Sequence, residues 1–271
     1  TLGKSINFDA FKPMVEICYK NKIKQFIYAS SSSVYGIKTE KNVTEDMTLE
    51  PLTDYSRFKA ECEKILNKYK SDDFVVTTIR PSTVCGYAKR QRLDLVVNIL
   101  SNHAFFKKKI KVFGGNQLRP NVHIDDMVDS YILILQSNYD KINGEIFNVG
   151  YKNQTVNELA EEVRYVMGDN IEIIRTQSDD NRSYHVSSEK IKNLLGFETK
   201  RTIKDAVKDL KESFENSPGV IVTHYLGLNS SELTDLRSQV KAIGAKFCVA
   251  KNSLAKLASK STDYESLNDF L

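Results

Sequence analysis

Three side chains suited to acid-base chemistry lie within the first sixty residues: Ser31, Tyr55 and Lys59. Tyr55 and Lys59 are four residues apart, so a helix places the phenol and the ammonium on one face. A phenol has a pKa of about 10, and a nearby positive charge lowers it toward the range in which the phenolate acts as a base. Ser31 follows an apolar run and is able to hydrogen-bond a reacting hydroxyl or carbonyl. Together the three side chains suit removal of a proton from an alcohol.

A plainer interpretation of the same residues stays open. A tyrosine and a lysine at this spacing arise easily by chance, and Lys59 is then a solvated charge on an amphipathic helix. The serines at residues 30–33 are then an ordinary polar loop. The surrounding elements and the motifs further along the chain have to decide between the two interpretations.

Short apolar runs alternate with longer amphipathic stretches along the chain. That alternation is typical of βαβ units and favours an α/β fold with a parallel sheet and helices on both faces. We expect strands at residues 25–30, 74–80, 110–113, 145–149 and 171–175, and helices at about 9–21, 55–70, 93–102, 125–136, 155–167, 188–195 and 202–214. Expected caps are Asp9, Ser187 or Ser188 and Thr202 at helix starts, with Gly168 and Gly196 at helix ends.

Composition places the chain among globular proteins. With 271 residues, 41% hydrophobic and 27% charged, it is long enough for more than one typical domain, and wholesale disorder is excluded. The net charge of +4 is too small to indicate a nucleic-acid partner by itself. The longest purely apolar stretches, such as residues 131–135, fall far short of the roughly 20 residues of a membrane span, so no membrane partner is expected.

The cysteines carry no recognisable site. Cys18, Cys62, Cys85 and Cys248 lack CxxC spacing, so we expect neither a disulfide framework nor a metal site. Free thiols fit a reducing compartment, which predicts a cytoplasmic protein.

A cluster of chain-breaking residues at 216–219 divides the sequence. Beyond it we expect a strand at 220–224, a helix at 230–242, a strand at 246–250 and a helix at 252–260. The predicted organisation is therefore one domain over residues 1–213 and a small separate α/β unit over residues 214–271.

Three segments occur together in an informative order: residues 28–36 (YASSSSVYG), residues 55–59 (YSRFK) and residues 119–126 (RPNVHIDD). In this order they resemble the extended short-chain dehydrogenase/reductases, a family that includes NAD-dependent nucleotide-sugar epimerases, dehydratases and ketoreductases. The likeness extends from about Asn7 to about Lys211. It implies a Rossmann-like sheet followed by small elements that bind the substrate.

The resemblance also implies roles for the matching residues. Ser31 matches the family's catalytic serine or threonine, Tyr55 the base, Lys59 the ribose-binding lysine and Asn7 an accessory asparagine. The implied cofactor is NAD or NADP, and the implied substrate is a nucleotide sugar. Besides Tyr55 and Lys59, the implied binding residues are Ser30 and Pro81 for the cofactor and Ser32, Thr83, Arg119 and Arg182 for the substrate.

Two of the substrate contacts have alternatives. Arg119 suits a diphosphate because its guanidinium is planar and always charged, but a salt bridge to Asp125 or Asp126 is the competing interpretation. Arg175 competes with Arg182 for a second phosphate contact.

The reaction implied by the resemblance is hydride transfer between a sugar alcohol and NAD(P). Tyr55 takes the hydroxyl proton, the sugar carbon gives a hydride to the cofactor, and the keto-sugar is re-reduced or released. Dehydratases that resemble this family carry Asp-Glu after the catalytic serine or threonine, whereas this chain has Ser32 and Ser33. The sequence therefore favours an epimerase or a ketoreductase.

Neither G-x-x-G-x-x-G nor G-x-G-x-x-G occurs in the sequence. In the family such a turn lets backbone N–H groups and a helix N-terminus hold the dinucleotide phosphates. We therefore expect the chain to begin midway through the Rossmann-like domain and to bind NAD(P) poorly on its own, which leaves its activity as an enzyme open. Relatives often pair through two long helices, so we expect a homodimer through the helix at 55–70, unless its apolar positions pack inside.

The C-terminal part has a different resemblance. Residues 220–228 (VIVTHYLGL) and residues 251–255 (KNSLA) resemble the N-terminal domain of the bacterial ribosomal stalk-base protein family. That family binds large-subunit rRNA, which implies rRNA contacts through Lys251, Asn252 and Lys256. Two alternatives remain: the lysines serve only solubility, or the whole chain is an inactive join of two truncated reading frames near residues 209–217.

Overall fold

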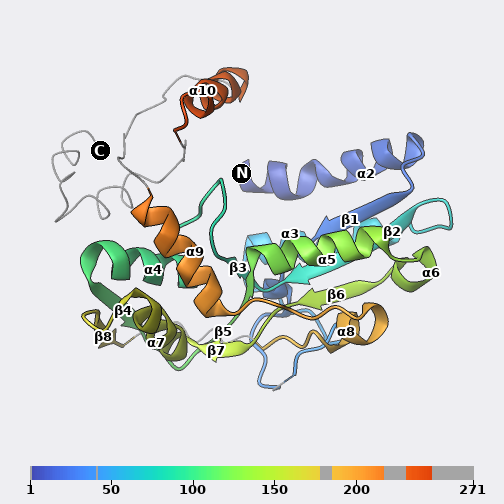
Figure 1. The fold of residues 1–271 in the computed structure, drawn as a ribbon. Helices are drawn as coiled ribbons and strands as arrows, with labels where there is room; N and C mark the ends of the chain where they lie inside the picture. Colours follow the sequence, from blue (N-terminus) through green and yellow to red (C-terminus); the bar gives the residue numbers. More distant parts are fainter. Residues whose placement is uncertain (1, 41, 178–184, 217–229, 246–271) are drawn as a thin grey trace.

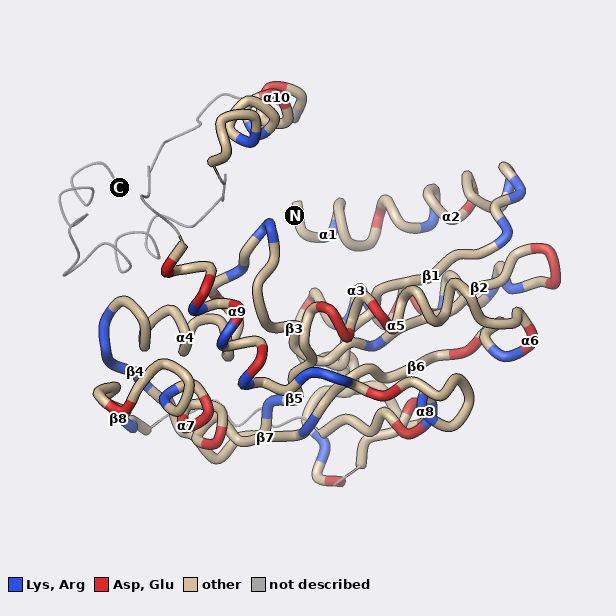
Figure 2. The backbone as a smooth tube through the Cα atoms, viewed as in Figure 1, with Lys and Arg blue, Asp and Glu red and all other residues tan. Residues whose placement is uncertain are grey.

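The computed structural model describes residues 2–40, 42–177, 185–216 and 230–245 of the chain. They form the α/β fold expected from the sequence, with parallel strands and helices in alternation (Figure 1). No helix within these residues is long and apolar enough to cross a membrane. Basic and acidic residues are interspersed along α7 (Val156–Met167) and α9 (Ile203–Glu215) in Figure 2, in keeping with the small net charge.

A parallel three-stranded sheet organises the first part of the chain. Its order is β1-β2-β6, with β1 at Gln25–Ala29, β2 at Val75–Pro81 and β6 at Ile146–Val149 (Figure 1). β2 pairs on both sides and is buried along nearly its whole length, although it contains Thr77, Thr78 and Arg80 besides its apolar residues. The parallel strands end at a common edge, where Ala29 is in register with Ile79.

Helices cover both faces of this sheet. Successive residues of a strand point to opposite faces, so in β2 Val76 packs with α2 (Phe11–Lys20) and α3 (Asp54–Asn67). On the other face Val75 and Ile79 pack with α5 (Ile124–Gln136) and α8 (Glu189–Leu195). The result is a three-layer arrangement in which α3, the helix that carries Tyr55 and Lys59, lies directly against the sheet.

Two smaller sheets follow. β3 (Thr83–Cys85) pairs in parallel with β5 (Leu118–His123), and β5 pairs in antiparallel fashion with β7 (Asn153–Thr155). β4 (Lys109–Phe113) and β8 (Glu172–Thr176) form a parallel pair.

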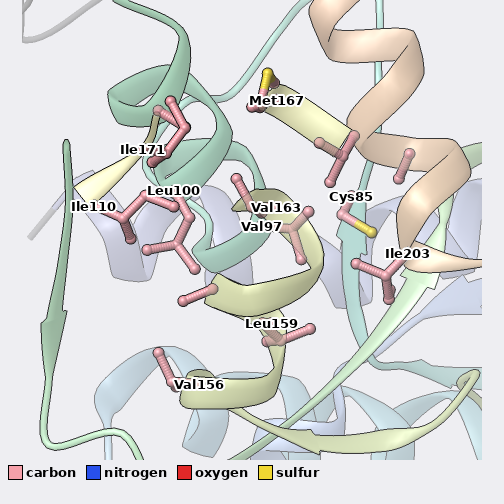
Figure 3. Close-up of a cluster of buried hydrophobic side chains, with 14 of the residues drawn as sticks. Cys85, Val97, Leu100, Ile110, Val156, Leu159, Val163, Met167, Ile171 and Ile203 are labelled. Carbon is pink, nitrogen blue, oxygen red and sulfur yellow. The ribbon is translucent and has the colours of Figure 1, made fainter. Parts of the chain in front are cut away.

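Three helices close around this second region and form the core of Figure 3: α4 (Val96–Lys107), α7 (Val156–Met167) and α9 (Ile203–Glu215). Its buried side chains come from all three helices and from β4; among those labelled are Val97, Leu100, Ile110, Leu159, Val163 and Ile203 (Figure 3). At the end of α9, Phe214 packs against Phe105 and Phe106 of α4, with ring centroids 5.4 and 5.2 Å apart.

The remaining elements are short or lie apart from these sheets. They are α1 (Leu2–Lys4), the π-helix η1 (Ser5–Asp9), the 3-10 helix η2 (Ser32–Tyr35), α6 (Tyr139–Ile142) and α10 (Ser230–Ala242). α10 confirms the helix predicted at 230–242. The strands predicted at 220–224 and 246–250 and the helix predicted at 252–260 lie outside the described residues.

The caps predicted at helix starts had mixed outcomes. Thr202 is confirmed, because its hydroxyl accepts from the N–H of Asp205 in a capping box. Before α8, the Ser187 hydroxyl accepts from the N–H of Glu189 at 3.4 Å, whereas the Ser188 side chain binds the backbone of Gly150. Asp9 is wrong as a cap, since the chain enters α2 through the π-helix and leaves Asp9 inside that turn.

At helix ends, Gly196 has the left-handed conformation expected of it, with φ 73° and ψ 18°. Gly168 also has a positive φ, 125°, but its ψ of 153° differs from that of the left-handed helical conformation. The five predicted strands and seven predicted helices are present with shifts of a few residues. The three strands β3, β5 and β7 were missed because they are short or polar, and β5 contains a proline.

Candidate active site

Ser31 lies just beyond the carboxyl end of β1. It begins η2 with an extended backbone, and its hydroxyl oxygen accepts from the N–H of Ser33 at 3.2 Å. The Ser31 and Ser33 hydroxyl oxygens are 2.9 Å apart. The side chain of Ser31 is therefore oriented by the turn that follows the strand, at the edge of a parallel sheet where ligands of such folds bind.

Tyr55 stands in the first turn of α3, and the start of that helix is firmly fixed. Thr53 and Ser56 form a capping box, in which the Thr53 hydroxyl accepts from the N–H of Ser56 at 3.2 Å and the Ser56 hydroxyl accepts from the N–H of Thr53 at 3.0 Å. Tyr55 keeps 47% of its surface exposed. A rigid helix start thus presents a solvent-accessible phenol.

Lys59 connects Tyr55 to the end of β1. Its ammonium donates to the carbonyl oxygen of Ala29 at 2.6 Å. The same nitrogen lies 4.9 Å from the ring centroid of Tyr28 and 5.6 Å from that of Tyr55. Because Ala29 is two residues before Ser31, this contact places the Lys59 turn of α3 beside the end of the strand that leads to Ser31.

The electrostatics correct one sequence-based expectation. Burial raises the pKa of Tyr55, and the positive charge that opposes this rise belongs to Arg92 rather than to Lys59. The Lys59 ammonium is engaged with a carbonyl and with the faces of two aromatic rings. Burial lowers the pKa of Lys59 itself, and the electrostatic interactions with Cys62 and with the carboxylate of Glu63 oppose that change.

Asn7 occupies the π-helical turn η1, and such turns are frequent at functional sites. Its side-chain amide donates to the carbonyl of Gly3 at 2.9 Å, and its own carbonyl accepts from the Cys62 thiol at 3.4 Å. Next to it, Phe8 stacks on Phe58 with ring centroids 5.6 Å apart. The turn that carries Asn7 is therefore packed against α3, the helix that carries Tyr55 and Lys59, while the role of Asn7 stays a prediction.

The two predicted cofactor contacts outside α3 lie at the same sheet edge. Pro81 is the last residue of β2, and Ser30 follows β1. Ser30 is 3% exposed, and its hydroxyl donates to the carboxylate of Glu63. The hydroxyl of Ser30 is therefore bonded to a buried carboxylate, which argues against a contact between this side chain and a cofactor.

The predicted substrate contacts spread over several elements. Ser32 is buried in η2. Thr83 of β3 pairs with Asn121 of β5. Arg119 of β5 lies opposite Gln154 of β7. Arg182 lies outside the described residues, as do the predicted rRNA contacts Lys251, Asn252 and Lys256.

The competing interpretations of these arginines are also decided in part. Asp126 accepts from the Arg201 guanidinium at 2.8 Å, and Asp125 lies 3.5 Å from it, so Arg201 is the partner of these carboxylates. Arg175 donates to Asn157 at 3.1 Å and to Glu161 of α7 at 2.9 Å. The Arg175 guanidinium is thus bound to two side chains of α7, which argues against a contact with a substrate phosphate.

Sequence reasoning missed the polar groups that support the site. Glu63, Arg80 and Tyr35 are all buried near the end of the sheet, and Arg80 donates hydrogen bonds to both Glu63 and Tyr35. Glu63 had a detectable signal, because it continues the four-residue spacing of Tyr55 and Lys59 along α3. Arg92 had none, since only the fold brings the loop between β3 and α4 near Tyr55.

One group of side chains in the described residues has the composition of a metal site. His123, Asp125 and Asp209 place one potential ligand atom each within 4.8 Å of one another. His123 is 1% exposed, its Nε2 is 3.1 Å from Asp209 and its Nδ1 accepts from the N–H of Asp125 at 3.1 Å. Both ring nitrogens are used in hydrogen bonds that join β5, α5 and α9.

Comparison with known proteins assigns the first part of the chain. The model of the NAD dependent epimerase/dehydratase family matches residues 4–150, which is more than half of the chain. The chain therefore belongs to this family, and the resemblance seen in its sequence motifs is confirmed.

Individual relatives agree with this assignment. Over 146 residues the chain is 34% identical to an uncharacterized UDP-glucose epimerase, YtcB, of Bacillus subtilis, a match that covers 53% of this chain and 45% of the relative. It is 25% identical to a solved UDP-glucuronic acid 4-epimerase of Bacillus cereus in complex with UDP-glucuronic acid and NAD. The TM-score is 0.68, with 77% of this chain and 67% of the other covered. The chain spans 45% of the length of YtcB and 62% of the length of a second relative, the UDP-glucose 4-epimerase of Lactobacillus helveticus, which is less than two thirds in each case.

A second family model, ribosomal protein L10, matches residues 198–271. Over 67 residues the chain is 43% identical to the large ribosomal subunit protein uL10 of Rhizorhabdus wittichii, which covers 25% of this chain and 39% of the relative. The second resemblance is thus also confirmed. Its match begins ahead of α9, although α9 contributes buried residues to the core in Figure 3.

Proposed function

We propose that the first part of the chain performs NAD(P)-dependent hydride transfer on a nucleotide sugar, as an epimerase or a ketoreductase. The observation that carries this proposal is the position of Lys59, which binds the carbonyl of Ala29 and lies over the ring of Tyr55. That contact brings the candidate base to the sheet edge where Ser31 is oriented. Membership of the epimerase/dehydratase family and the names of the relatives support the same activity.

In this proposal Tyr55 takes the proton of a sugar hydroxyl, and the Ser31 hydroxyl donates a hydrogen bond to the oxygen as it becomes a carbonyl. The site residues fit a dinucleotide, because Lys59 offers an ammonium to the ribose and Pro81 lies at the same edge of the sheet. NAD(P), when bound, supplies the hydride acceptor. Lys59 orients the ribose, and Arg92 is the cation that opposes the raised pKa of Tyr55.

The residues after Ser31 favour an epimerase or ketoreductase over a dehydratase. Ser32 and Ser33 carry hydroxyl groups, so neither offers a carboxylate that could move a second proton. The substrate is proposed to be a UDP-sugar, on the strength of the relatives' names.

The experiment that tests this function replaces the phenol hydroxyl. Tyr55→Phe is expected to abolish epimerisation of UDP-glucose or of UDP-glucuronic acid in the presence of NAD, and reduction of a UDP-keto-sugar by NADH or NADPH, each followed by NMR of the sugars. Tyr139→Phe removes a hydroxyl of similar exposure on α6, 45% against 47%, and is the matched control. The chain is assayed together with any residues that its reading frame encodes ahead of Thr1. Undiminished turnover in Tyr55→Phe overturns the assignment.

We propose that pairing of two copies uses the outer surface of α2 beside α3. The apolar residues of α3, among them Cys62 and Leu66, are buried in the chain's own core, whereas Met14 and Ile17 on α2 are 46% and 61% exposed. Ile17→Lys is expected to convert a dimer into a monomer in sedimentation velocity. Leu135→Lys, at 57% exposure on α5, is the control, and an unchanged dimer in Ile17→Lys rules out this surface.

A second function is favoured by the ribosomal protein L10 match: binding of large-subunit rRNA by the C-terminal part. We expect neutralising Lys251 and Lys256 to weaken binding to an rRNA fragment and to reduce the slope of log affinity against log salt by about 2. Lys20→Gln with Lys22→Gln is the control pair. Equal salt slopes for the two double variants contradict rRNA contacts at Lys251 and Lys256.

We further propose that the first domain ends with α9, near Glu215, rather than at residue 213. Support comes from Phe214, which packs on Phe105 and Phe106. The competing view, an inactive join of two truncated frames, predicts that transcripts from a single genome contain no continuous frame across residues 209–217. One uninterrupted transcript removes it.

A further inference from the structure

A buried ion pair lies behind the candidate active site. The guanidinium of Arg80 donates to both carboxylate oxygens of Glu63, from Nε at 3.1 Å and from Nη2 at 2.7 Å. The two side chains are 3% and 6% exposed. Arg80 also donates to the Tyr35 hydroxyl at 2.8 Å and to the carbonyl of Glu45 at 3.1 Å. The Tyr35 hydroxyl in turn donates to Asn148 of β6 at 2.7 Å.

This pair joins the elements that carry the catalytic side chains. Glu63 belongs to α3, Arg80 to β2, and the hydroxyl of Ser30 at the end of β1 donates to Glu63. One turn earlier on α3, Lys59 donates to Ala29. Two consecutive residues at the end of β1 are therefore tied to two residues one turn apart on α3, immediately before the chain reaches Ser31.

Stability alone is a poor explanation for such a pair. Removing two charges from water costs several kcal/mol, and well-packed apolar side chains of similar volume often hold buried elements equally well. An apolar side chain offers no acceptor in a fixed direction, so it would leave the Ser30 hydroxyl unsatisfied and the end of β1 free to shift against α3. Displacements of about 1 Å at a catalytic group reduce rates roughly a hundredfold.

We propose that Glu63, held by Arg80, is a positioning residue that fixes the Ser31 end of β1 against the Tyr55–Lys59 turn of α3. This inference rests on the proposed function. Glu63 touches neither substrate nor cofactor and acts through Ser30 and Lys59.

The carboxylate of Glu63 also acts electrostatically on Lys59. The titratable groups facing the Lys59 ammonium are Tyr28 from β1 and Tyr55, Cys62 and Glu63 from its own helix. Burial lowers the pKa of Lys59, and the interactions with Cys62 and with the negative charge of the Glu63 carboxylate oppose that change. Loss of that charge shifts the titration of Lys59 to lower pH, so any activity that depends on the ammonium ends at a lower pH.

Glu63→Gln tests the proposal, and Glu61→Gln is its matched control. The Glu61→Gln substitution makes the same chemical change on the same helix. There the Glu61 carboxylate pairs with the exposed ammonium of Lys64 at 2.7 Å. In Glu63→Gln we expect a ten- to hundredfold loss of kcat with KM for the nucleotide sugar unchanged. We also expect the pKa of Lys59, followed by NMR of ¹³C-methylated lysines and assigned with Lys59→Arg, to fall. Glu61→Gln should match the wild type in both.

Chemical rescue separates positioning from folding. A cleft of about 230 Å³ lined by Glu63 and Arg80 opens between α3 and the start of β6. In Glu63→Ala we expect formate, but not its neutral analogue formamide, to restore turnover and the titration of Lys59, because formate gives Arg80 a carboxylate again.

The outcomes distinguish this inference from the proposed function. Absence of hydride transfer in the wild type sinks the proposed function, whereas the titration of Lys59 still tests the role of Glu63. An unchanged Lys59 titration in Glu63→Gln, with turnover lost only in proportion to the unfolded fraction, shows the pair to be merely structural and overturns the inference.

Discussion

Replacing Leu210 by alanine tests whether α9 belongs to the epimerase-like core. Leu210 is 0% exposed and lies on the same helix as Ile203, Ala206 and Val207, which pack with α4 and α7. The same helix lies within the ribosomal protein L10 match. If α9 is part of the first domain, a cavity at Leu210 must loosen α4 and α7.

The size of the effect follows from burial. Leucine to alanine removes about three methylene equivalents, worth about 0.8 kcal/mol each, and the remaining cavity adds to the loss. The expected decrease in the free energy of unfolding is about 2–5 kcal/mol. Since about 1.4 kcal/mol corresponds to a factor of ten, the most protected amides of α4 and α7 should exchange roughly thirtyfold to several thousandfold faster.

Hydrogen exchange followed by mass spectrometry measures this change helix by helix. Leu135→Ala, the same substitution at a 57% exposed position on α5, should leave exchange within about twofold of the wild type. If peptides from α4 and α7 keep their protection in Leu210→Ala, α9 contributes nothing to this core and the proposed boundary near Glu215 is wrong.

Two further predictions concern charge. Hydrogen bonds from Thr202 lower the pKa of Asp205 from 3.8 to about 2, so the carboxylate stabilises the folded state above its ordinary pKa, and this contribution is lost as the pH falls toward 2. Asp205→Asn should therefore unfold at lower urea concentration than the wild type at pH 7, and the two midpoints should converge near pH 2; a constant gap contradicts the argument. Arg92→Ala should raise the pKa of Tyr55 further, because Arg92 is the cation that opposes the effect of burial. NMR of ¹³Cζ-labelled tyrosine reads this shift, Arg90→Ala is the control, and equal titrations in both variants refute the role of Arg92.

The candidate residues Ser31, Tyr55 and Lys59 show what local information can predict. Tyr55 and Lys59 share a helix face because four residues make about one turn, and that relation holds in any fold that keeps the helix. The end of β1 at Ala29 was equally readable, because an apolar run followed by serines marks a strand and its turn. Helix starts with a short-range cap, such as Thr202 with Asp205, were predictable for the same reason.

Contacts across the sequence were out of reach. The cation opposing the raised pKa of Tyr55 is Arg92, which lies 37 residues further along the chain, so no spacing rule identifies it. The strand pairs β3-β5 and β5-β7 were missed because their residues are polar or few, and their pairing depends on partners far along the chain. The hydroxyl of Ser30 looked available from the sequence, but the fold turns it toward Glu63.

The sequence by itself determined the α/β class, the parallel strands, the helix face of Tyr55 and Lys59, and the two family resemblances, because all of these depend on periodicity and on contiguous motifs. Only the tertiary structure decided that Lys59 binds Ala29, that Glu63 and Arg80 lie together behind the site, and that α9 completes the core with α4 and α7. Those relations arise where elements distant in the chain pack together, and periodicity indicates which face of an element is buried but not which distant element it packs against.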